Sequence, residues 1–252
     1  MQISNTYQIA QQTVHTKKRY LEDVVLLRLS LIFLLIWNHA FAPYSGHWRS
    51  IDGINDIPTY YWFGQIIYYM RIQALIFISG YLLGYTSKRK SDALEFKSCV
   101  IKKIKRLLLP SIIFSILYFL FFYDYTGSII TTAYSILNGC GHMWFLPMLF
   151  WCFVGVWLAE KFHIQPKLIL ILALFASILP CITLPLRFNS TLTYFIYFYI
   201  GFGLQRGYFD FLKPKQSITP ILISIGIYIS FFLFTESFRP HILSAGASGG
   251  GG

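Results

Sequence analysis

Arg28 and His39 lie eleven residues apart in an almost entirely apolar stretch, residues 26–41. On an α-helix, eleven residues make three turns plus about 20°, so both side chains share one face, about 16 Å apart along the axis. Ionisable residues inside a membrane span cost free energy and tend to face a cavity or a partner. The pair therefore predicts a polar stripe on a membrane helix. The alternative is that Arg28 reaches lipid phosphate and His39 caps the outer interface.

Arg71 and His142 are two further ionisable residues in or beside apolar runs. Arg71 lies near the middle of residues 60–85, about eleven residues from either end, so its side chain is too short to reach the membrane surface. We expect it to face a partner or water inside a helix bundle, as a structural ion pair or in a ligand site. His142 precedes the apolar run 143–159, and we expect it at the same membrane level as His39.

A dense cluster of cations precedes the third apolar run, in the segment CVIKKIKRLLLP at residues 99–110. Its members are Lys102, Lys103, Lys105 and Arg106. Lysine and arginine beside a span orient a membrane protein and contact anionic lipid. The same side chains suit the phosphates of a cytoplasmic ligand, because they bring several charged hydrogen-bond donors close together.

The composition indicates an all-α membrane protein. Of the 252 residues, 56% are hydrophobic and only 12% are charged, about half the charge of a typical soluble domain. The four cysteines have no paired spacing, so neither a metal site nor a disulfide framework is expected. No soluble basic domain is apparent, which argues against nucleic acid as a partner. Windows long enough to cross a bilayer predict about seven spans, near residues 24–43, 60–85, 107–123, 143–159, 168–184, 192–205 and 219–235.

The distribution of basic residues predicts the topology of this polytopic bundle. Every second loop is basic, at Lys17–Arg19, Lys88–Arg106, Lys161–Lys167 and Arg206–Lys215. This bias predicts a cytoplasmic N-terminus, and it explains the net charge of +11 as topology and contact with membrane lipids. We expect three parts, namely a cytoplasmic segment at residues 1–19, a transmembrane domain at 20–240 and a disordered glycine-rich tail at 241–252.

Five ordered motifs resemble those of the integral-membrane acyltransferase family 3, which includes sugar O-acetyltransferases of bacterial cell envelopes. They are Arg28 and His39 with ten residues between them, FISGYLLGY preceded by Arg71, KKIKRLLLP, HMWFLPMLF, and YFIYFYIGFGL at residues 194–204. They occur in order along most of residues 20–207. The chain departs from many family members at Leu29 and Asn38, where those have glycine. Members generally have more spans, so we expect the domain to be C-terminally incomplete.

The resemblance implies an enzyme that crosses the inner membrane several times and takes an acetyl group from acetyl-CoA in the cytoplasm. The acceptor would be a hydroxyl of an envelope glycan or lipid-linked sugar. Arg28 and the basic cluster would hold the coenzyme A phosphates. His39 would act as general base, or it would carry the acetyl group as an acyl-imidazole. An imidazole suits the first role because its reference pKa is about 6.5. Arg71 and His142 would stabilise the oxyanion or place the acceptor.

Two other functions compete with this interpretation. A transporter or flippase for a polar or lipid-linked solute would also need buried arginine and histidine along its pathway. It would not need a cytoplasmic cluster for phosphates, so acetyl-CoA binding by the purified protein separates the two classes. The short chain and the glycine-rich tail would also fit an inactive, truncated acyltransferase.

Overall fold

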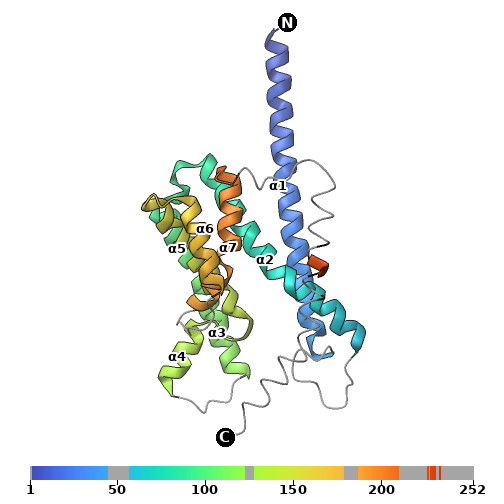
Figure 1. The fold of residues 1–252 in the computed structure, drawn as a ribbon, viewed down its shortest axis with the longest axis vertical. Coiled ribbons are helices and arrows are strands. Elements are labelled where there is room, and N and C mark those ends of the chain that lie inside the picture. The colour runs from blue at the N-terminus through green and yellow to red at the C-terminus, as the bar shows by residue number, and fades with distance from the viewer. Residues whose placement is uncertain are drawn as a thin grey trace. The chain divides into compact units, whose positions relative to one another are not determined.

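The computed structural model describes residues 2–44, 57–122, 128–178 and 187–209, together with 226, 228–230 and 233. These residues form helices and no strands, which confirms the all-α prediction. The α-helices are α1 (Gln2–Phe41), α2 (Pro58–Arg89), α3 (Leu109–Phe122), α4 (Ile129–Leu137), α5 (Phe145–Lys161), α6 (Pro166–Ile178) and α7 (Phe188–Arg206) (Figure 1). Short 3₁₀ turns cover η1 (Ala42–Tyr44), η2 (Ser91–Leu94) and η5 (Gly141–Trp144), and π-helical turns cover η3 (Lys97–Ile101) and η4 (Ile104–Leu108).

Three helical stretches are long and apolar enough to cross a membrane. Within the part of the chain that the structure describes, they are Glu22–Phe41, Thr59–Arg89 and Lys97–Phe121. α5, α6 and α7 coincide with three more of the predicted spans but are shorter or less apolar. The predicted span at 219–235 lies almost wholly outside the described residues, as does the tail at 241–252. The total of seven spans and the cytoplasmic N-terminus therefore stay predictions.

The helices extend beyond the apolar runs that the sequence marks. α1 begins at Gln2, inside the polar segment, because residues 2–41 contain neither proline nor glycine to interrupt a helix. The charge pattern predicts a loop over Lys88–Arg106, but much of this segment is helical and leads into α3. Pro110 has no N–H to close a regular turn on residue 106, and the wide π-helical turns of η4 end just before it.

The described chain forms two compact units. The first consists of Met1–Leu31 and Ile72–Asp210, and the second of Ile32–Arg71 and Phe211–Gly252. Within the first unit, α5, α6 and α7 lie side by side, η3 and η4 pack on α5, and α4 packs on α3 (Figure 1). The side chains at its centre are fully buried and come from α2, α5 and α7, including Ile76, Met148, Cys152, Phe198 and Phe202.

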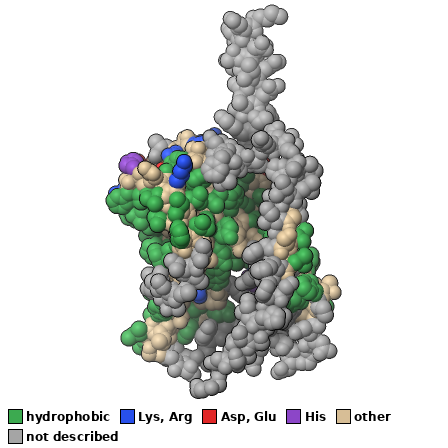
Figure 2. Space-filling view, viewed as in Figure 1, with side chains coloured by type: hydrophobic (Ala, Val, Ile, Leu, Met, Phe, Trp, Pro, Cys, Tyr) green, Lys and Arg blue, Asp and Glu red, His purple; other side chains and the backbone are tan. Residues whose placement is uncertain are grey.

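Large apolar side chains also cover the outside of the first unit. On α6, Leu172 and Phe175 are 56% and 62% exposed. Figure 2 shows hydrophobic side chains over much of the visible side of this unit. Soluble monomers rarely expose contiguous apolar surface on this scale. These side chains therefore face lipid, in agreement with the membrane assignment.

Glycines bring the second half of α2 into close contact with α7. Gly80 and Gly84 form a G-x-x-x-G pattern, and a Cβ at Gly80 would overlap the carbonyl oxygen of Phe198. A Cβ at Gly201 of α7 would overlap the carbonyl oxygen of Phe77 on α2. Small residues allow helix backbones to approach closely within membranes. The ISGYLLG and YIGFG segments are thus the two sides of one helix–helix contact.

Arg187 holds the loop that leads into α5. Its backbone N–H donates to Asn138 Oδ1 at 3.0 Å, and its Nε donates to the Asn138 carbonyl at 2.8 Å. The N–H of Cys140 donates to the hydroxyl of Ser115, which is fully buried, at 3.0 Å. These bonds define the backbone just before His142, whose side chain is not among those that the structure describes.

A polar contact joins the end of α5 to the end of α7. Arg206 Nη2 lies 3.4 Å from Glu160 Oε2, and the Tyr208 hydroxyl donates to Glu160 Oε1 at 3.0 Å. Burial raises the pKa of the Tyr208 phenol, so it stays protonated at neutral pH. Glu160 therefore serves as an acceptor between these two helices, which is a structural role.

Candidate functional site

A cavity of about 390 Å³ lies within the first unit. α2 contributes one wall, the segment from Asp92 to Leu107 contributes another, and α5 supplies an apolar surface. The volume is toward the lower end of the roughly 300–1,000 Å³ typical of small-molecule sites. The lining residues are Arg28, Ser79, Leu82, Leu83, Thr86, Lys90, Asp92, Ala93, Ser98, Lys102, Lys103, Arg106, Leu107, Leu149 and Phe153.

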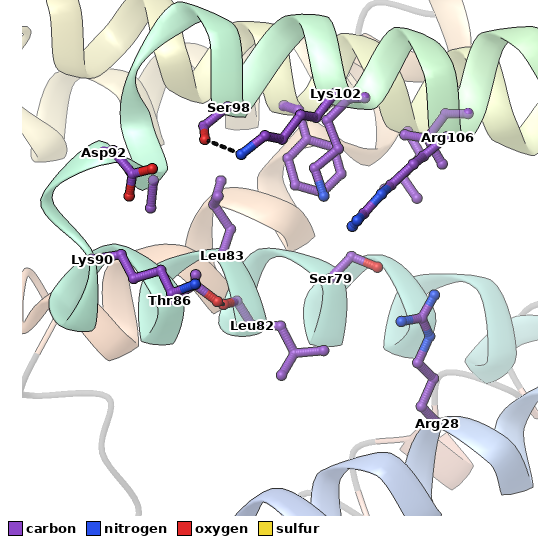
Figure 3. A pocket seen from close by; sticks show the side chains of 15 residues that line it. Arg28, Ser79, Leu82, Leu83, Thr86, Lys90, Asp92, Ser98, Lys102 and Arg106 are labelled. Carbon is purple, nitrogen blue, oxygen red and sulfur yellow. Dashed lines mark hydrogen bonds between the residues drawn. The ribbon is translucent and has the colours of Figure 1, made fainter.

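Cations from two parts of the chain meet around this cavity. Arg28 comes from α1, and Lys102, Lys103 and Arg106 come from the segment between α2 and α3 (Figure 3). The sequence predicts these four as binding residues, and the structure brings them together. Lys105, predicted with them, is exposed and does not line the cavity. Lys90 adds a cation that the motif comparison does not single out.

The π-helical turns on either side of Lys102 and Lys103 position these two lysines differently. Lys102 Nζ donates to Ser98 Oγ, one turn earlier, at 2.9 Å (Figure 3). Lys103 Nζ lies 3.9 Å from the centroid of the Phe153 ring on α5. A cation over an aromatic face is stabilised by the ring quadrupole. The Phe153 ring therefore holds the half-buried Lys103 ammonium group in place at the edge of the cavity.

Two hydroxyls on α2 present only acceptor lone pairs to the cavity. Ser79 Oγ donates to the Leu75 carbonyl and Thr86 Oγ1 to the Leu82 carbonyl, each at 2.8 Å. Because each hydroxyl has a single proton, neither can donate to a phosphate at the same time. The side-chain donors available to an anionic ligand in this cavity are therefore the cations and the hydroxyl of Ser98, which accepts from Lys102 and keeps its own proton.

His39 and Arg71 belong to the second unit. His39 is half-buried on α1, and Arg71 is only 3% exposed on α2. The burial of Arg71 agrees with the expectation that its side chain faces the inside of a helix bundle. The functional roles predicted for both residues, and for His142, stay predictions.

Asn38 fixes α1 against α2 next to His39. Its Nδ2 donates to the Gly64 carbonyl at 3.0 Å. Beside this bond, the Phe41 ring lies 4.8 Å from that of Tyr60, between ring centroids. This departure from the family's glycine thus provides a hydrogen bond between two helices. Together these contacts position the backbone that carries His39.

The described residues contain no group of three or more His, Cys, Asp or Glu side chains that could hold a metal ion. The polar side chains that line the cavity are its cations, three hydroxyl groups and one carboxylate, that of Asp92.

The family model described as an acyltransferase domain, that of acyltransferase family 3, matches residues 21–247. The chain belongs to acyltransferase family 3. The match covers every predicted site residue and both walls of the cavity. A search of curated proteins and a search of solved structures each found no match.

Membership of acyltransferase family 3 makes a membrane acyltransferase the supported class of function, in preference to the transporter.

Two residues of the cavity, Lys90 and Asp92, were not predicted from the sequence as binding residues. Lys90 lies inside the basic stretch Lys88–Arg106, so the charge pattern alone contains the signal that would have found it. Asp92 has no such signal, because a carboxylate among basic residues is typical of a solvated segment.

Proposed function

We propose that this acyltransferase moves an acetyl group from acetyl-CoA to a hydroxyl of an envelope glycan or lipid-linked sugar. The observation that carries the proposal is the convergence of Arg28, Lys102 and Arg106 on one cavity. In this proposal the protein spans the inner membrane about seven times and opens this cavity to the cytoplasm.

The cavity suits the phosphate-bearing part of coenzyme A. Arginine binds phosphate oxygens with two parallel hydrogen bonds, and lysine adds a mobile point charge. Charge-assisted hydrogen bonds of this kind contribute about 1.5–3 kcal/mol each. The apolar surface of Leu83, Leu149 and Phe153 can cover the nucleoside. The pantetheine arm is long and thin, so it needs only a narrow path from the cavity to the reacting centre.

The chemical step is assigned to His39. α1 continues without a break from Arg28 to His39. As general base, the imidazole takes the proton of the acceptor hydroxyl while its oxygen attacks the thioester carbonyl. The carbon–sulfur bond then breaks, and coenzyme A leaves as the thiol after it takes up a proton. In the second possibility, the imidazole nitrogen attacks first and passes the acetyl group on from an acyl-imidazole.

Arg71 and His142 are proposed to assist at the reacting carbonyl. A positive charge or a hydrogen-bond donor directed at the developing oxyanion lowers the barrier most where water is excluded. The burial of Arg71 supports such an assignment, because a guanidinium inside a membrane protein is retained chiefly for function or for pairing. Both residues are also candidates for placing the acceptor.

Arg106→Ala is expected to weaken acetyl-CoA binding by about ten- to hundredfold, as loss of charged hydrogen bonds to phosphate predicts. The matched control is Lys105→Ala, which removes the same charge from the neighbouring position. Lys105 does not line the cavity, so its loss is expected to change affinity less than about twofold. Binding of radiolabelled acetyl-CoA to the purified protein in lipid nanodiscs measures both constants.

The paired design separates ligand binding from membrane orientation. Both variants reduce the basic charge of the same segment by one, so any effect on topology is shared. Equal loss of binding in the two variants would show that the segment acts through its overall charge, and the proposed cavity would then be wrong. Failure of the unaltered protein to bind acetyl-CoA would remove the proposed function itself.

A further inference from the structure

The cavity has two chemically different ends. Arg28 and Arg106 lie at one end, and Lys90 and Asp92 lie at the other (Figure 3). Asp92 is the one carboxylate among the lining residues. Thr86 also lies toward the Asp92 end, and its hydroxyl proton is already donated to the carbonyl of Leu82. This end therefore combines two acceptors with Lys90 and with the hydroxyl of Ser98, whereas the other end has the two arginines and the Ser79 hydroxyl.

The Asp92 carboxylate is not neutralised by its basic neighbours. Among the described residues it forms no ion pair, although Lys90 and Lys102 line the same cavity. Lys102 donates to Ser98 Oγ instead. A carboxylate repels phosphate, so a polyanionic ligand is expected to place its phosphates toward the two arginines. Asp92 is exposed, and a ligand group that replaces water at its carboxylate is favoured when it is a hydrogen-bond donor.

We propose that Asp92 is a specificity residue that recognises the adenine base of the donor by accepting a hydrogen bond from its exocyclic amino group. This inference rests on the function proposed above. The order of groups in coenzyme A matches the two ends of the cavity. Adenine lies at Asp92, the phosphates lie toward Arg28 and Arg106, and the pantetheine leaves the cavity on the arginine side.

The proposal makes a sharp distinction between two nearly identical bases. Hypoxanthine carries a carbonyl oxygen where adenine carries the amino group, so a carboxylate directed at position 6 would face an acceptor instead of a donor. The N1–H of hypoxanthine lies one ring position away, and the base would have to shift to present it to Asp92. Hydrogen bonds to charged groups contribute enough for their loss to reduce affinity by about tenfold or more. A site built to bind a donor rejects an analogue that lacks it, because its own polar group is left unpaired.

The experiment uses the full chain in lipid nanodiscs. Radiolabelled acetyl-CoA is displaced by adenosine 3′,5′-bisphosphate or by inosine 3′,5′-bisphosphate, which differ only in the base. The measured quantity is the ratio of the two inhibition constants. The unaltered protein is expected to prefer the adenosine compound by about tenfold or more.

Asp92→Asn is expected to bring this ratio close to one. The amide can accept from adenine through its oxygen or donate to hypoxanthine through its nitrogen, so it suits both bases. The substitution also removes a negative charge and is expected to strengthen binding of both anionic compounds. That effect cancels in the ratio, because the two compounds carry the same charge.

Glu95→Gln is the matched control. Glu95 is exposed, follows Asp92 by one helical turn and does not line the cavity. Its substitution changes the net charge equally and is expected to leave the ratio at the value of the unaltered protein. A ratio near one in the unaltered protein, or an unchanged ratio in Asp92→Asn, overturns the role of Asp92 and leaves the acetyl-CoA site standing. Absence of acetyl-CoA binding overturns both proposals.

Discussion

His39→Ala is expected to lower the rate of acetyl transfer by about a hundred- to ten-thousandfold, the range over which general acid–base groups contribute. Affinity for acetyl-CoA is expected to stay within about twofold, because the proposed phosphate contacts lie in a cavity that His39 does not line. The measurement pairs the appearance of acetylated glycan, followed by mass spectrometry, with the binding of radiolabelled acetyl-CoA to the same purified protein.

The control for this substitution is His163→Asn. His163 is exposed just beyond α5 and has a backbone φ of 49°, a conformation that asparagine tolerates better than alanine. This variant removes an imidazole without touching α1, and its transfer rate is expected to match that of the unaltered protein. Transfer at the normal rate by His39→Ala would exclude His39 from the reaction.

The two chemical roles left open for His39 differ in one observable. If the imidazole carries the acetyl group, brief exposure to radiolabelled acetyl-CoA without acceptor leaves label on the protein, and His39→Ala abolishes it. If the imidazole acts only as a base, no label is retained. Coenzyme A release under the same conditions provides the independent count of turnovers.

The candidate site divides into a part that sequence predicts and a part that it cannot. Arg28 stands out because a cation inside an apolar run is unusual, and Arg106 stands out because it belongs to a dense basic cluster that matches a family motif. Lys105 satisfies the same criteria, yet it does not line the cavity. The backbone of this segment does not follow one regular helix, since it passes from π to α and back around Lys102 and Lys103. Periodicity arguments assume one regular helix and therefore cannot separate neighbours in such a segment.

The fold shows a similar division. Long apolar runs predict α2 and the apolar parts of α1 and α3, because the membrane selects for hydropathy over a fixed length. α4 escapes that argument because its nine residues, Ile129–Leu137, are too few to span a membrane. Apolar runs do not predict the polar first half of α1, because hydropathy does not report helix formation outside the bilayer. Contacts between helices depend on backbone approach, which a few glycines permit and hydropathy does not reveal.

Gly80→Ala is expected to destabilise the protein by about 3 kcal/mol, the upper part of the range for overpacking. A Cβ at this position would overlap the carbonyl oxygen of Phe198, which belongs to the backbone and cannot change rotamer. Alanine stabilises a helix by about 1 kcal/mol relative to glycine. Gly80→Ala therefore destabilises the protein only if the cost of the steric overlap exceeds this gain. The thermal unfolding midpoint in detergent measures the effect.

Gly226→Ala is the control that separates the helix preference of alanine from the steric overlap. Gly226 is exposed and helical, and a Cβ there meets no atom within 4 Å. Its substitution is therefore expected to leave the midpoint unchanged or to raise it, opposite in sign to Gly80→Ala.

Gly80→Ala is also expected to weaken acetyl-CoA binding. Ser79 and Leu83 lie close to Gly80 on α2 and line the cavity, so a displacement of α2 from α7 moves them. If both glycine variants raised the unfolding midpoint alike, the inferred close contact of α2 with α7 would be wrong. The inference that α2 forms one wall of the cavity would then be wrong as well.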